Sequence, residues 1–194
     1  MYKQCTTEKA AQQQRHIEAC LLTDMQKRDY HDITVSALCE KAELSRKTFY
    51  RLFSSKDDVL LALIDHTMMD YARFRLPSER RLPNAPGELQ RFFVYWQENR
   101  CLLDVLNNSR QASLLLERAI AHVMREEHSA LRWLGADQRS TQLETTVFYI
   151  SGIMGLLLSW YHSGFARTPA EMANIMLHLM SISPIQNPKS LDLI

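Results

Sequence analysis

The segment Thr34–Lys56, TVSALCEKAELSRKTFYRLFSSK, decides how the rest of this chain is interpreted. Apolar residues recur at helical spacing over about 35–42 and again over about 46–53, which predicts two short helices. Thr34 and Ser45 stand just before them, and hydroxyl side chains at such positions cap a helix by accepting from its first N–H groups. The segment therefore predicts a capped pair of helices joined by a tight turn.

The second predicted helix has two different faces. Because an α-helix turns about 100° per residue, the cations and the tyrosine of this segment fall within one arc of about 140°. These residues are Arg46, Lys47, Tyr50 and Arg51. The opposite arc carries Leu52, Phe49 and Phe53, and Thr48 lies between the two. One face is suited to packing and the other to an anionic partner.

Two helices joined by such a turn have the layout of the helix-turn-helix, whose second helix enters the major groove of DNA. Arginine and lysine side chains on that helix can donate to guanine or to phosphate. We expect Arg46 and Lys47, at the start of the helix, to contact base edges. The same pattern is also compatible with an ordinary corner of two helices whose basic face meets only water.

The composition favours an all-helical protein. The 194 residues are 46% hydrophobic and include five glycines and six prolines, without alternating β-branched runs. The net charge is only +1, so any surface for nucleic acid must be local. The four cysteines are widely spaced, as is typical of reduced thiols in a cytoplasmic protein.

No membrane partner is expected from the sequence. Residues 1–14 are polar and lack the apolar core of a targeting signal. The most apolar run, Val147–Tyr161, is shorter than the roughly 20 residues that a membrane span needs. We expect it to be a helix buried between other helices.

Helical spacing of apolar residues continues along the chain, and it predicts further helices over about 8–28, 56–74, 88–100, 102–107, 112–131, 141–163 and from 168 onward. The stretch 76–87, LPSERRLPNAPG, contains three prolines and a glycine and is expected to interrupt this pattern. Gly164 is expected to end the penultimate helix. Thr168, Pro169 and Glu171 are the cap, first-turn proline and capping-box acid of the last one.

These features resemble the TetR family of bacterial transcriptional repressors, over about residues 15–71. The likeness rests on Thr34-Val35 with Leu38-Cys39 and Ala42, on TFYRLF at 48–53, and on SKDDVL at 55–60. Residues 148–165 also resemble the penultimate helix of one common subgroup. Glu43 departs from the family, which usually has glycine in this turn, and we expect the turn to close without a positive φ there.

The resemblance implies further DNA contacts. Thr48 and Tyr50 match positions that face the groove or the backbone, with the Tyr50 hydroxyl on a phosphate. Thr34 and Lys56 match positions that anchor phosphates at the starts of two helices. The predicted DNA-binding set is Thr34, Ser45, Arg46, Lys47, Thr48, Tyr50, Arg51 and Lys56.

The resemblance also implies a homodimer formed by the last two helices of each subunit. The predicted interface consists of Gly152, Gly155, Leu156, Trp160, Met172, Ile175, Met176 and Leu179. Gly152 and Gly155 would allow close helix approach, although plain tolerance inside a crowded core is the alternative. The predicted domains are a DNA-binding domain at 1–56, a helical effector-binding and dimerisation domain at 57–183, and a flexible tail at 184–194.

A hydrophobic small-molecule effector is expected in the second domain. The candidate lining residues are aromatic or polarisable: Tyr95, Trp96, Cys101, His122, Trp133 and Phe148. Each is also explained as an ordinary core residue, because aromatic side chains at helical spacing normally pack. A cavity lined by such residues would suit an apolar effector.

Enzymatic motifs are absent from the sequence, and no catalytic residue, metal or cofactor is expected. His122 and Glu126 lie one helical turn apart, but two ligands do not make a metal site. The sequence predicts a dimeric repressor that binds a palindromic operator and is released by an effector. The alternatives are a DNA-binding regulator switched by a protein partner and a helical interaction protein.

Overall fold

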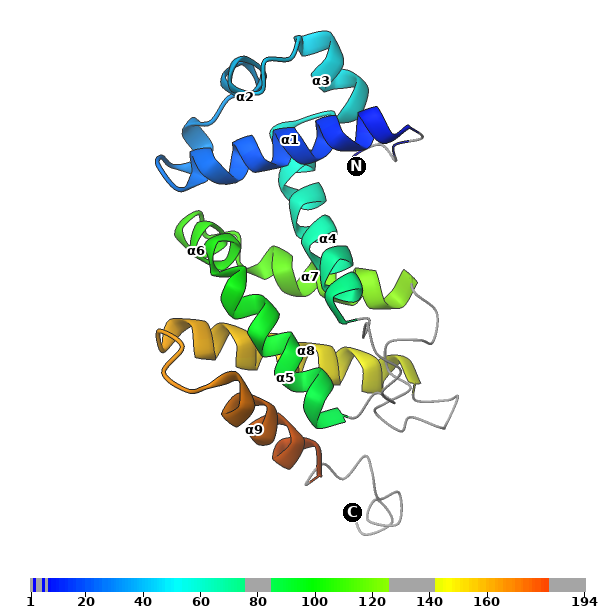
Figure 1. The fold of residues 1–194 in the computed structure, drawn as a ribbon, viewed down its shortest axis with the longest axis vertical. Helices are drawn as coiled ribbons and strands as arrows, with labels where there is room; N and C mark the ends of the chain where they lie inside the picture. Colours follow the sequence, from blue (N-terminus) through cyan, green and yellow to red (C-terminus); the bar gives the residue numbers. More distant parts are fainter. Residues whose placement is uncertain (1, 3–4, 6, 76–84, 126–141, 182–194) are drawn as a thin grey trace. The chain divides into compact units, whose positions relative to one another are not determined.

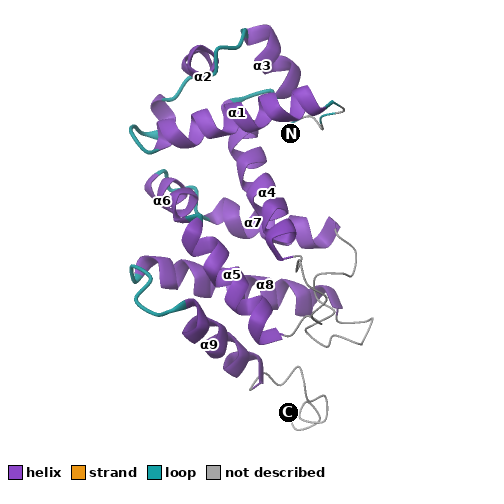
Figure 2. Cartoon of the chain, in the orientation of Figure 1, coloured by secondary structure: helices purple, strands orange, loops and turns teal. Residues whose placement is uncertain are grey.

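The computed structural model of the chain describes residues 2, 5, 7–75, 85–125 and 142–181 (Figure 1). The regular elements in these ranges are all helical, as Figure 2 shows, which confirms the predicted class. They are α1 (Glu8–Met25), η1 (Tyr30–Asp32), α2 (Val35–Lys41), α3 (Arg46–Leu52), α4 (Lys56–Arg75), α5 (Ala85–Glu98), α6 (Arg100–Asn108), α7 (Ser113–Arg125), α8 (Gln142–His162) and α9 (Pro169–Ser181).

Two local features differ from the sequence prediction. A short 3₁₀ helix, η1, occupies the predicted loop before α2. Helix α5 begins at Ala85, so Pro86 and Gly87 lie in its first turn and not in a break. Proline is accepted there because the first N–H groups of a helix have no partner within the helix.

The chain divides into two compact units. The first contains Met1–Asp70 together with Arg100–Arg118, and the second contains Tyr71–Asn99 and Ala119–Ile194. Helix α6 thus packs with α1 in the first unit. The predicted domain limits at residues 56 and 183 remain a prediction, and the predicted tail lies outside the described residues.

The core of the first unit joins α1, α2 and α3. Phe49 and Phe53 are completely buried, and Leu52 is nearly so, which confirms the packing face predicted for α3. They share this core with the buried side chains of Ile17 and Leu38 from α1 and α2. The polar face of α3 is therefore turned to solvent.

The turn between α2 and α3 closes differently from the prediction. Glu43 has φ of 52°, in the left-handed region that favours glycine. Its N–H donates to Glu40 O at 3.1 Å, and the Leu44 N–H donates to Cys39 O at 2.9 Å, which is the Schellman pattern of a helix end. The expectation that the turn closes without a positive φ was wrong, because this pair of hydrogen bonds forms only when the residue after the C-cap, here Glu43, is left-handed.

In the second unit, α5 packs against α9. The Trp160 ring meets Phe93 edge-on at 5.5 Å between centroids, and its indole N–H donates to Arg167 O at 2.8 Å. Gly164 has φ of 70°, which confirms it as the residue that ends α8. The Thr168 hydroxyl accepts from the Glu171 N–H, while the Glu171 carboxylate accepts from the Thr168 N–H at 2.7 Å. The predicted capping box is thereby confirmed.

Helix α8 is longer than its most apolar run. Within the described residues, its segment Leu143–His162 is long and apolar enough to cross a membrane by length and composition, and 39% of it is buried inside the chain. The argument that this helix is too short to span was therefore wrong, because α8 extends beyond Val147–Tyr161 at its N-terminal end. A core helix of a soluble protein meets the same criteria.

Candidate DNA-binding surface

Both helices of the pair carry the predicted caps. The Thr34 hydroxyl accepts from the Ala37 N–H at 3.2 Å, and the Ser45 hydroxyl accepts from the Thr48 N–H at 3.1 Å. The Ser45 and Thr48 hydroxyl oxygens also lie 3.0 Å apart. Each cap fixes the first turn of its helix, so the start of α3 is well defined by local hydrogen bonds alone.

The outer face of α3 is cationic, as the sequence predicts. Arg46, Lys47, Tyr50 and Arg51 are exposed, with 51% of Tyr50 accessible, whereas Thr48 is half-buried. The Tyr50 ring stands edge-on to buried Phe49 at 5.5 Å, which supports it from below. This face presents guanidinium, ammonium and phenol groups to solvent over two helical turns.

The two arginines of this face are each tied to another helix. Arg46 Nη2 donates to the hydroxyl of Ser36 on α2. Arg51 Nη2 donates to Gln13 Oε1 on α1 at 3.3 Å. Sequence reasoning did not identify Ser36 or Gln13, because both hydrogen bonds depend on how separate helices pack.

Lys56 is placed differently from the other predicted contacts. Its ammonium donates to three backbone oxygens: Tyr30 O at 2.6 Å, His31 O at 3.1 Å and Ile33 O at 2.9 Å. It also lies 4.5 Å from the centre of the Tyr30 ring. An ammonium has three N–H donors, so these oxygens occupy all of them. Lys56 thus ties η1 to the start of α4, and its predicted phosphate contact remains a prediction.

A second bond joins the same elements, because the Tyr30 hydroxyl donates to the Asp57 carboxylate. Burial, followed by this hydrogen bond, raises the pKa of Tyr30. The phenol therefore stays protonated, which lets it remain a donor. The chain just before the α2 cap is consequently held to α4 through both Lys56 and Asp57.

An acidic residue braces α2 against α1. Asp24 is buried and accepts from Lys41 Nζ and Arg28 Nη2, both at 2.6 Å. Burial opposes the ionisation of Asp24, but the hydrogen bonds from Lys41 and Arg28 outweigh it and lower the pKa of this carboxyl. The brace holds α2, and through the turn α3, in a fixed orientation on α1.

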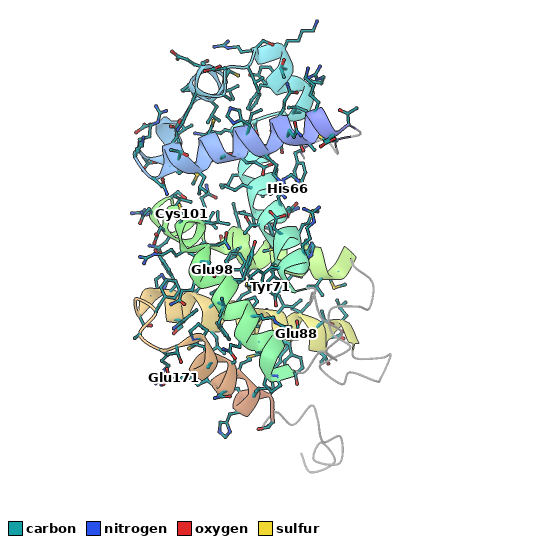
Figure 3. All side chains as sticks on the ribbon, in the orientation of Figure 1. His66, Tyr71, Glu88, Glu98, Cys101 and Glu171 are labelled. Carbon is teal, nitrogen blue, oxygen red and sulfur yellow. The ribbon has the colours of Figure 1, made fainter. Side chains whose placement is uncertain are left out.

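The predicted effector residues are not all brought together. Tyr95 and Trp96 are buried on α5, and Phe148 on α8 is 56% exposed. His122 is half-buried on α7. Cys101 lies on α6 in the first unit (Figure 3). Its sulfur accepts a hydrogen bond from Gln26. Trp133 lies outside the described residues, and the effector site remains a prediction.

The predicted interface residues range from exposed to buried, with Leu156 and Ile175 half-buried. Gly152 and Gly155 are exposed, with open space around the position that a Cβ would take. Trp160 and Met172 are core residues of their own unit. Between α8 and α9 lies a groove of about 280 Å³, lined by Phe148, Tyr149, Gly152, Leu156, Met176, Leu179 and Met180.

Among the described residues, no group of three or more His, Cys, Asp or Glu side chains could hold a metal ion. Glu126, the possible partner of His122, lies outside the described residues. The site built by α2 and α3 is one for recognition, with exposed donors on a rigid support.

Comparison with known proteins supports this assignment. Residues 25–63 match the family model of bacterial regulatory proteins of the tetR family. The chain is 26% identical over 166 residues to the uncharacterized HTH-type transcriptional regulator YxbF of Bacillus subtilis, a match that covers 81% of this chain. The chain spans only 41% of the length of that relative.

Solved structures share the fold. The Lin0861 protein of Listeria innocua superposes with a TM-score of 0.70 at 17% identity, over 92% of this chain and 94% of that one. A TetR transcriptional regulator of Streptococcus agalactiae superposes with a TM-score of 0.62 at 19% identity, over 89% and 95% of the two chains. Both matches extend over most of this chain, including its helix-turn-helix unit and helical C-terminal part.

Proposed function

Because residues 25–63 match the family model of tetR-type bacterial regulatory proteins, we propose that the chain is a DNA-binding transcriptional regulator of the TetR family, a repressor that binds a roughly palindromic operator as a homodimer. On this proposal it is a regulator and not an enzyme. The observation that carries the proposal is the capped helix α3, whose inner face is buried and whose outer face exposes Arg46, Lys47 and Arg51. Two such helices on one dimer would enter successive major grooves.

Some of the proposed DNA contacts recognise bases, and the others anchor the protein to the phosphate backbone. Arg46 and Lys47 stand at the start of α3 and would reach base edges. Thr34, Ser45, Thr48, Tyr50 and Arg51 would meet the groove wall and the phosphates. The ammonium of Lys56 is occupied by backbone oxygens, so we assign it to supporting the turn that precedes Thr34.

A second copy of the chain would cover the outer face of α8 and α9. Phe148 is 56% exposed and Leu179 is 44% exposed on this face, and both line the apolar groove. Large exposed apolar side chains that gather on one surface are typical of an interaction site. Gly152 and Gly155, both open to solvent, would let the two copies of α8 approach closely.

An apolar small molecule, bound in the second unit, would release the repressor from DNA. Trp96 Nε1 and Tyr149 OH are buried and meet no hydrogen-bond partner within the described residues. Buried polar atoms normally have a partner, and a ligand with one or two polar groups could supply it. Such an effector acts only through its differential affinity for the two DNA-reading geometries. The regulator would work in the bacterial cytoplasm.

The test of DNA binding is selection of bound sequences from a random duplex pool, followed by anisotropy titrations of the recovered site. We expect salt-dependent binding that Arg46→Ala and Lys47→Ala weaken, and two half-sites about one helical turn apart. No salt-dependent binding by the parent, or variants that behave like it, would overturn the proposal.

The test of the effector is tryptophan fluorescence during a metabolite screen. Trp96 and Trp160 belong to the second unit, and Trp133 falls within the predicted effector-binding domain, so a ligand bound there should change the tryptophan emission. A compound that changes the emission should also dissociate the operator complex. If no compound does so, a regulator switched by a protein partner becomes the better account.

A further inference from the structure

The hydrogen bond between Arg46 and Ser36 joins the first residue of α3 to the first turn of α2. Arg46 Nη2 is the donor and the Ser36 hydroxyl oxygen the acceptor, across ten positions of sequence and the intervening turn. Both side chains are exposed, so this bond is not a by-product of core packing. It fixes the direction of a long side chain that would otherwise sample many rotamers in solvent.

The hydrogen bond leaves the guanidinium of Arg46 able to meet DNA. A guanidinium carries several N–H donors in a plane, and a single one of its terminal nitrogens is engaged by Ser36. The remaining donors include those that form a bidentate pair with guanine O6 and N7. The serine oxygen accepts from Arg46, so the serine influences DNA binding through the arginine.

The position of the Arg46 charge agrees with this restraint. The Cys39 thiol is buried on α2, and its burial raises its pKa while the charge of Arg46 acts in the opposite direction. The hydrogen bond to Ser36 places the guanidinium beside α2, in agreement with this effect. Lys47, the neighbouring cation, makes no hydrogen bond or ion pair within the described part of the chain. Arg46 is therefore restrained by a neighbouring side chain, whereas Lys47 is not.

We propose that Ser36 is a positioning residue that pre-orients Arg46 for one base pair and thereby sets the specificity of the operator at that position. This inference rests on the proposed function. Ordering a rotamer-rich side chain opposes binding, and a side chain already ordered in the unbound protein avoids most of that cost. Arg46 would thus discriminate sharply between bases, and Lys47 would contribute a less directional attraction.

The test uses the selected operator and a set of single-base variants of it. The variant Arg46→Ala identifies the base pair that Arg46 reads. Substitution of that base pair lowers the operator affinity of the parent but does not lower the affinity of Arg46→Ala any further. We expect Ser36→Ala to weaken operator binding about two- to tenfold and to lose discrimination at that base pair. The slope of log affinity against log salt should stay unchanged, because no phosphate contact is removed.

Two controls separate positioning from a structural role. Ser36→Ala should leave the thermal midpoint near that of the parent, and Ser113→Ala, at the start of α7, should change neither stability nor discrimination. The double variant Ser36→Ala/Arg46→Ala should bind like Arg46→Ala alone, because the serine acts only through the arginine.

Four results would overturn the inference while leaving DNA binding intact: unchanged discrimination in Ser36→Ala, a uniform loss across all base variants, additive losses in the double variant, or tighter operator binding by Ser36→Ala. The last would mean that the serine holds Arg46 away from DNA. Absence of duplex binding by the parent would instead overturn the proposed function and this inference with it.

Discussion

Asp65 on α4 and Arg118 on α7 form a two-point ion pair although 53 positions separate them in sequence. Arg118 Nε donates to Asp65 Oδ1 at 2.7 Å and Nη2 donates to Oδ2, and the Asp65 side chain is completely buried. The Tyr2 hydroxyl donates to Oδ2 at 3.0 Å. This pair joins the first half of α7 to the middle of α4 within the first unit.

Removing the arginine should expose how much the first unit depends on this pair. Arg118→Ala leaves the Asp65 carboxylate buried without its main partner, so we expect a loss of about 3–5 kcal/mol in the free energy of unfolding. Urea unfolding at neutral pH measures it. Asp65→Leu/Arg118→Leu should recover most of the loss, since no charge then remains buried. A loss of less than about 1 kcal/mol in Arg118→Ala would contradict the prediction.

Glu43→Gly should stabilise the protein. Glu43 has φ of 52°, and a left-handed conformation costs a side-chain-bearing residue more than it costs glycine. After the greater flexibility of glycine in the unfolded chain is subtracted, we expect a gain of about 0.5–1 kcal/mol by thermal unfolding. Glu40→Gly, inside α2, is the matched control and should destabilise by a similar amount. A fall in stability for Glu43→Gly would argue against the Schellman turn.

Lys56→Met should lower the free energy of unfolding but leave the salt dependence of DNA binding unchanged. The ammonium donates to three backbone oxygens, and its removal leaves them with fewer partners, for an expected loss of about 1.5–3 kcal/mol. At a temperature where the variant is folded, the salt slope of operator binding should match that of the parent. A slope smaller by about one would show instead that Lys56 neutralises a phosphate, as the resemblance to the TetR family implies.

The α1–α2 brace predicts a specific dependence of stability on pH. The pKa of Asp24 is lowered in the folded state, so its contribution is fully present above the unfolded pKa of about 3.9 and is lost as pH falls through the folded pKa. The difference in unfolding free energy between the parent and Asp24→Asn should therefore be largest near pH 6 and shrink toward pH 3. Urea unfolding across that range measures it. A difference that stays constant with pH would rule out this titration.

The exposed face of α8 and α9 should control the oligomeric state. Leu179→Glu places a charge beside the groove, where burial in an interface would be costly, so the dimer dissociation constant should rise at least about tenfold. Light scattering after size exclusion reports the mass. Asn174→Glu, an exposed substitution on α9 outside the groove lining, should remain dimeric. A parent that is monomeric at micromolar concentration would contradict the proposed dimer.

Local patterns were enough to predict much of the fold. The caps at Thr34 and Ser45, the two faces of α3 and the capping box at Thr168 follow from spacing and residue type, because each depends on atoms a few residues apart. The helical class follows from periodicity in the same way. Predicting that α8 ends at Gly164 required only the rule that glycine accepts a positive φ.

Only the tertiary structure decided how these elements act on one another. It directs Lys56 to backbone oxygens, places Cys101 in a different unit from Trp96, and imposes a left-handed φ on Glu43. It also brings Ser36 to Arg46. The physical reason is that these outcomes are set by helix packing between distant segments, and by the need to satisfy every buried donor and acceptor. The sequence by itself determined that α3 has a cationic face, and the packed chain determined which of its cations are restrained and by what.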